Sequence, residues 1–210
     1  MGGRLLNTRK ARMVKKNFSS RKDLPIRAVS AAVFSSLALF LQGKGIGDMS
    51  GIQAVDLKGF VTKAVQGVFQ TMLSMPLESE DPPNIQSVTT GQHIVGTVGF
   101  AGAAMGNVSI FVSREFAREM TAAMLGMTVD DIGSDEEVHD VIGEVCNMVG
   151  GDLKSRLCDA GFSCSLSIPS VTFGENFRTE SKGWDRHERY GVRNSHHSAL
   201  MEVCIKAANQ

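Results

Sequence analysis

Apolar positions in residues 134–157 recur with the 3.6-residue period of an α-helix. The stripe that they form at 100° per residue consists of Val138, Val141, Ile142, Val145 and Val149. Ser134, followed three residues later by Glu137, is a capping box that marks the beginning of the helix. We therefore expect one long amphipathic helix here, with the valine-rich stripe packed on the core.

The opposite face of this predicted helix is polar and carries Asp140, Glu144 and Asn147. Glu144 and Asn147 are three positions apart, so the carboxylate and the carboxamide point in the same direction. Lys154 lies on this face as well. The glycines beside it are Gly143, Gly150 and Gly151. Because a glycine lowers helix stability by about 1 kcal/mol relative to alanine, we expect these three to let another backbone come close. Taken alone, the polar residues are also compatible with an ordinary solvated surface.

Periodicity and turn residues predict the other elements. A helix is expected over residues 55–75, and a second one from its N-cap Ser113 to Leu125, with Gly126 ending it. Alternating apolar residues predict strands at 95–100, 107–112, 162–168 and 199–207, with 171–173 continuing the sheet. Residues 78–84 are read as a loop, and residues 177–194 as a charged, turn-rich connection. The expected fold class is an α/β sheet domain with amphipathic helices packed on it.

The first 48 residues differ from the rest in charge and pattern. They hold ten lysines and arginines and two aspartates, whereas residues 49–210 hold twelve basic and twenty acidic residues. A basic tract precedes a 14-residue apolar stretch at 28–41, which is shorter than the ~20 residues of a typical membrane-spanning helix. We expect residues 1–48 to be a separate extension, or to precede a natural start at Met49, and residues 49–210 to be the folded domain. An export or anchoring segment is the open alternative.

Composition also argues against several kinds of site. The acidic balance of residues 49–210 argues against nucleic-acid binding, which depends on cationic contacts to phosphates. No two of the four cysteines have the Cys-x-x-Cys spacing, so we expect free thiols. We expect Cys146 to pack in the core. The histidines and cysteines lack metal-ligand spacing, and the sequence contains neither a P-loop nor a Gly-x-Ser-x-Gly motif. No metal site is therefore expected in this chain.

The string IGEVCNMVGGDLKSRL, which contains Glu144 and Asn147, resembles the signature helix of the CheX/CheC-type chemotaxis phosphatases, with its Glu-x-x-Asn pair. The resemblance extends upstream over residues 93–127, a glycine-rich strand–turn–strand followed by a helix ending in Met-Leu-Gly. It extends downstream over the string SIPSVTFGENF, residues 167–177. Residues 55–75 contain no Glu-x-x-Asn, so the chain resembles the single-site CheX form and not the two-site CheC form.

The resemblance implies a sheet domain with pseudo-duplicated halves that hydrolyses the aspartyl phosphate of a CheY-type response regulator. In that reaction Asn147 would place the attacking water, and Glu144 would bind a lysine of the receiver domain. The remaining residues of the expected docking face are Asp140, Gly143, Gly150, Gly151 and Lys154. Phosphoryl transfer is catalysed mainly by positioning and by Mg²⁺. The Mg²⁺ is expected on the receiver, so this chain is expected to need no cofactor of its own.

The expected partners are a phosphorylated CheY-like receiver domain and a second copy of the chain in a homodimer. Neither nucleic acid nor a membrane is expected as a partner, and the expected location is the cytoplasm, where the receiver is. The alternative function is a non-catalytic binding module for a response regulator or a flagellar protein. The presence of Asn147 favours the enzyme over this alternative.

Overall fold

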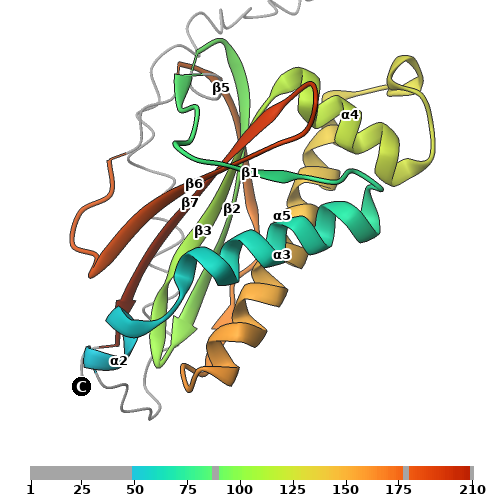
Figure 1. Ribbon diagram of the computed structural model, residues 1–210. Helices are drawn as coiled ribbons and strands as arrows, with labels where there is room; N and C mark the ends of the chain where they lie inside the picture. The colour runs from blue at the N-terminus through green and yellow to red at the C-terminus, as the bar shows by residue number, and fades with distance from the viewer. Residues whose placement is uncertain (1–48, 87–89, 177–179, 209–210) are drawn as a thin grey trace, which may run out of the picture.

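The computed structural model describes residues 49–86, 90–176 and 180–208 (Figure 1). The expected extension, residues 1–48, lies outside the described residues, so the domain boundary stays a prediction. The helices are α2 (Met49–Ala54), α3 (Leu57–Met72), α4 (Arg114–Leu125) and α5 (Asp135–Asp159), with a short 3-10 turn, η2, at Val129–Asp131. The strands are β1 (Glu78–Glu80), β2 (Gln92–Gly102), β3 (Ala104–Ser113), β4 (Cys164–Leu166), β5 (Ser170–Glu175), β6 (Arg186–Arg193) and β7 (Ser198–Ala207).

The described strands form one antiparallel sheet in the order β1-β6-β7-β3-β2-β4, and β5 also pairs with β2. Each half of the chain supplies a helix, one or two short edge strands and a long hairpin. The first half supplies α3, β1 and β2–β3, and the second supplies α5, β4 with β5, and β6–β7. The edge strands of each half pair with the hairpin of the other half, since β1 joins β6 and β4 and β5 join β2. If β1 is exchanged with β4, β2 with β6 and β3 with β7, the strand order stays the same when it is read from the other edge. This symmetry confirms the expected α/β class and its pseudo-duplication.

Helices α3, α4 and α5 cover one face of the sheet, and α3 crosses over α5 in the view of Figure 1. The core between helices and sheet is one cluster of buried side chains, of which Phe69, Phe100 and Phe116 are the largest. Of the described helices, none is both long and apolar enough to cross a membrane. The sheet and the three helices together form the platform on which the candidate site lies.

The predicted charged connection at residues 177–194 is partly wrong, because residues 186–193 form strand β6. Tyr190 and Val192 of this strand are buried in the core, while the alternate residues face the other side of the sheet. There Arg189 pairs with Glu202 of β7, at 2.6 Å. Strand β6 is rich in charged residues, one of which is paired on the neighbouring strand, so its composition alone resembles that of a loop. Residues 78–80, predicted as loop, likewise form the edge strand β1 against β6.

The predicted ends of the helices are mostly confirmed. Gly126 ends α4 in the left-handed conformation, with φ of 68°. Ser134 caps α5, its hydroxyl accepting from the Glu137 amide at 3.3 Å. The expected capping box is only half formed, because the Glu137 carboxylate accepts from the Gly133 amide at 2.9 Å. The first long helix begins at Leu57 because Asp56 caps it.

Candidate functional site

Helix α5 has a buried face and a polar face, as predicted. The valine-rich stripe is buried, with every member at most 5% exposed. Glu144 and Asn147 are exposed on the opposite face. Within the described part of the chain, neither side chain makes a hydrogen bond or an ion pair. Both functional groups are therefore free to bind a partner.

Glycines let α5 lie close to strand β2. A Cβ built on Gly150 would come within 2.5 Å of Val98 Cγ1, and a Cβ on Gly96 of β2 would overlap the Cys146 sulfur. Gly150 is buried against the sheet, so its assignment to the docking face is wrong. The close backbone approach that the glycines predicted exists, but it lies inside the fold. It fixes the distance between α5 and the sheet.

The other proposed docking residues differ in position. Gly143 is also buried, with Val171 and Pro169 3.7 and 3.9 Å from the place of its Cβ, so its assignment to the docking face is corrected as well. Gly151 has open space at its Cβ position. Asp140 has an 80% exposed side chain.

Lys154 is half-buried near strand β4. Burial raises the pKa of the Cys164 thiol to about 11, and the Lys154 ammonium partly opposes this shift. Lys154 therefore lies at the β4 end of α5, seven positions beyond Asn147.

The adjacent glycines of α5 give a test of this packing. We expect Gly151→Ala to raise the free energy of unfolding by about 0.5–1 kcal/mol, because alanine is the better helix former and the space is open. Gly150→Ala should lower it by about 1–2 kcal/mol, because the new methyl group collides with Val98. Denaturant unfolding of both variants measures the difference. Equal stabilities would contradict the described packing of α5 on β2.

The exposed face of α5 is acidic. Glu136, Asp140 and Glu144 are exposed along it, and Asp135 at its beginning is paired with Arg114 at 2.6 Å. Acidic residues in the first turn also interact favourably with the helix dipole. This face is therefore suited to a partner that presents basic groups around its own site.

The cysteine that lies between Glu144 and Asn147 in the sequence, Cys146, does not offer a reactive thiol. Cys146, as expected, is in the core at 1% exposure, and all four cysteines are free. Burial raises the pKa of the Cys146 thiol to about 12, so the thiolate needed for nucleophilic attack does not form near neutral pH. The groups that α5 offers to a partner in this stretch are thus the Glu144 carboxylate and the Asn147 carboxamide.

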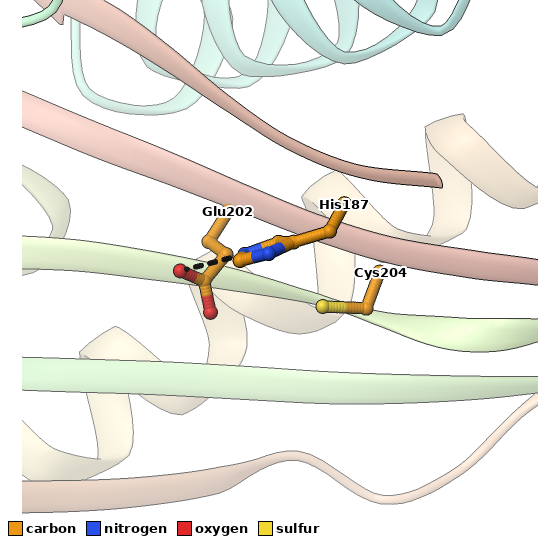
Figure 2. A group of neighbouring side chains, drawn as sticks. All are labelled: His187, Glu202 and Cys204. Atoms are coloured by element: carbon orange, nitrogen blue, oxygen red, sulfur yellow. Dashed lines mark ion pairs between the residues drawn. The ribbon is translucent and has the colours of Figure 1, made fainter. Parts of the chain in front are cut away.

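A cluster that the sequence spacing did not suggest lies across β6 and β7 (Figure 2). The potential ligand atoms of His187, Glu202 and Cys204 lie within 4.8 Å of one another. His187 faces Cys204 in the strand register, which brings together residues 17 positions apart. One Glu202 carboxylate oxygen lies 3.2 Å from His187 Nε2 and 2.7 and 2.6 Å from two nitrogens of Arg189. Since this guanidinium already pairs with the carboxylate, the arrangement is that of an ion-pair cluster around the buried Glu202.

The polar face of α5 can act by positioning. A carboxamide offers both an acceptor and donors without a charge, so it can orient water beside an anion without repelling that anion. The neighbouring carboxylate can accept a charge-assisted hydrogen bond from a cationic side chain. A rigid helix carrying both groups can insert them into a partner's site.

Comparison with known proteins places the helix in a family context. The family model described as chemotaxis phosphatase CheX matches residues 94–189, which include Glu144 and Asn147. A CheY-P phosphatase CheX of Thermotoga maritima is 25% identical over 127 residues, covering 59% of this chain and 81% of that protein.

Two solved structures resemble the chain in fold. The chemotaxis protein CheX of Vibrio vulnificus has a TM-score of 0.63 and 27% identity, and the match covers 72% of this chain and 97% of that one. The CheX of Borrelia burgdorferi, solved as a CheX–CheY–BeF₃–Mg²⁺ complex, has a TM-score of 0.56 and 22% identity, and the match covers 72% and 99% of the two chains.

Proposed function

Since the chain belongs to the CheX/CheC-type chemotaxis phosphatase family, we propose that it accelerates hydrolysis of the aspartyl phosphate of a CheY-type response regulator. One observation carries the proposal: Glu144 and Asn147 are exposed together on α5, and neither makes a hydrogen bond or an ion pair with another described residue. The relative from Thermotoga maritima is named a CheY-P phosphatase, and the Borrelia burgdorferi protein was solved with CheY, which supports a CheY-like partner.

In this proposal Asn147 positions the attacking water. The carboxamide oxygen accepts a hydrogen bond from the water, so that a lone pair of the water points in line with the phosphorus. A neutral side chain suits this place, because a carboxylate would repel the phosphoryl oxygens. The aspartyl phosphate is an activated mixed anhydride, so positioning is the main help that it needs. The receiver's Mg²⁺ neutralises the charge of the phosphoryl group.

Glu144 anchors the helix in the partner's site by accepting a charge-assisted hydrogen bond from a receiver lysine. Such a bond contributes about 1.5–3 kcal/mol. Asp140, one turn earlier on the same face, adds negative potential toward that basic group. Gly151, one turn after Asn147, leaves open space for the receiver backbone.

The test is incubation of the purified full-length protein with phosphorylated receiver domains from the same organism. We expect one or more receivers to lose phosphate faster than they do alone. Binding to a receiver without any change in its dephosphorylation rate would favour the non-catalytic binding module. The proposal also locates the protein in the cytoplasm with its partner, and cell fractionation measures that location.

We further propose a two-fold homodimer formed through the edge of the sheet near the C-terminal half. Strand β1 pairs only with residues 191–193 of β6, so among the described strands the outer edge of residues 186–190 is unpaired. An unpaired strand edge is a template for pairing with a second chain. Light scattering at micromolar concentration should give twice the chain mass. A clean monomer would contradict the dimer without touching the phosphatase proposal.

A further inference from the structure

A β-bulge interrupts the edge of the sheet beside α5. Strand β4 pairs with β2 as far as Phe100 and Leu166, and pairing resumes in β5 at Thr97 and Ser170. Two residues of β2 therefore face three residues of the edge, 167–169, so the edge has one extra residue. Bulges re-aim side chains and are common next to active sites.

Hydrogen bonds from Ser167 hold this bulge in one conformation. Its amide donates to the Gly99 carbonyl at 2.8 Å, and its hydroxyl accepts from the Gly99 amide at 3.0 Å. The same hydroxyl donates to the Ile168 carbonyl at 2.9 Å. Pro169, next in sequence, has no amide hydrogen and suits such a position. Ile168 is thus carried on a backbone that is fixed on both sides.

The bulge turns Ile168 outward. Its side chain is 88% exposed, whereas the next most exposed large hydrophobic residue of the described segments, Met72, is 50% exposed. Single exposed apolar residues are common on surfaces. This one differs because it is rigidly held and because its neighbour, Pro169, lies 3.9 Å from the Cβ position of Gly143 in α5.

The bulge lies on the Asn147 side of α5. Gly143 and Asn147 are four residues apart, which places them about 40° apart around the helix axis. Further along the same flank, the rings of Phe173 and His139 stack with their centroids 5.9 Å apart. An apolar flank, consisting of Ile168, Pro169 and Phe173, with the His139 ring stacked on Phe173, thus runs beside the acidic face of α5.

We propose that Ile168 is the apolar anchor of the receiver-binding surface. The inference rests on the proposed function, because the occupant is the receiver domain that brings its phosphoryl group to Asn147. The acidic face attracts the basic groups of that partner, and the adjoining Ile168 packs on an apolar patch beside them. A contact on the flank of α5 prevents the receiver from rotating about the helix and so determines which receivers dock productively.

Three variants of the full-length chain test this anchor against a receiver domain loaded with beryllium fluoride and Mg²⁺. Ile168→Ala should weaken binding about tenfold and raise KM for the phosphorylated receiver by a similar factor, with kcat within about twofold of wild type. Ile168→Leu should restore both values to within about threefold, because its apolar volume is similar. Leu125→Ala, a 46% exposed leucine at the end of α4, is the matched control and should change neither.

The readouts separate this inference from the function on which it rests. Thermal unfolding of Ile168→Ala should match wild type, because an 88% exposed side chain packs on little of the fold. Unchanged binding and KM in Ile168→Ala, with an active wild type, would overturn the anchor alone. A wild type that binds the receiver but does not dephosphorylate it would overturn the proposed function. The anchor would still stand in that case if Ile168→Ala lost binding.

Discussion

Replacing Asn147 with alanine is expected to reduce the acceleration of receiver dephosphorylation by about 100-fold or more. Removing one well-placed polar group from a transition state typically costs a factor of this size. Binding of a beryllium-fluoride-loaded receiver should stay within a few-fold of wild type, because the lost contact acts on the attacking water. Single-turnover measurement of receiver dephosphorylation, together with a binding titration, checks both parts.

The control for Asn147→Ala is Val145→Ala, on the buried side of the same helix. Val145 is fully buried, so its truncation should lower the free energy of unfolding by roughly 1–3 kcal/mol. Asn147→Ala should not lower stability, since this side chain is exposed and makes no hydrogen bond with the described residues. Full activity in Asn147→Ala would remove the proposed mechanism even if the phosphatase assignment survived.

Replacing Glu144 with alanine is expected to impair binding itself. If a receiver lysine is left without its partner, the affinity should fall by about 1–3 kcal/mol, which is roughly 5- to 150-fold. The effect should shrink as salt is added, because the contact is between charges near solvent. A binding titration of the loaded receiver at two ionic strengths measures both the loss and its salt dependence.

The matched control is Asp159→Ala, which removes an exposed carboxylate from the last residue of the same helix. It should leave affinity within twofold, since it lies three turns beyond Asn147. If Asp159→Ala and Glu144→Ala weakened binding equally, the overall charge of α5 would account for the interaction, and a specific Glu144–lysine contact would not be needed.

The long helix and its two faces could be predicted from the sequence, because helix periodicity is a local property. The capping serine and the buried stripe follow from residues within one or two turns of each other. The pairing of Arg189 with Glu202, in contrast, depends on which strand lies next to β6, and local composition does not report that. The same limit explains why the sequence of strand β6 predicts a charged connection and not a strand.

The glycines show a second limit of sequence reasoning. The cost of a glycine in a helix correctly indicated a close approach, but it did not say to what. The answer lies in residues about 50 positions away, Gly96 and Val98 of β2, which meet α5 only in the folded sheet. The bulge at Ile168 was hidden for the same reason, since one extra residue in an edge strand shows only against its partner's register.

The separation of α5 into two faces has an evolutionary consequence. Stability constrains the buried half of the helix, through Gly150 and the valine-rich stripe, while the exposed Glu144 and Asn147 make no hydrogen bond or ion pair with the described residues. Selection for folding alone therefore leaves these two positions free to drift. A descendant that no longer needs the reaction can lose both residues in two substitutions and remain a well-folded binding protein. Across such descendants, the identity of two surface side chains reports the chemistry better than overall structural similarity does.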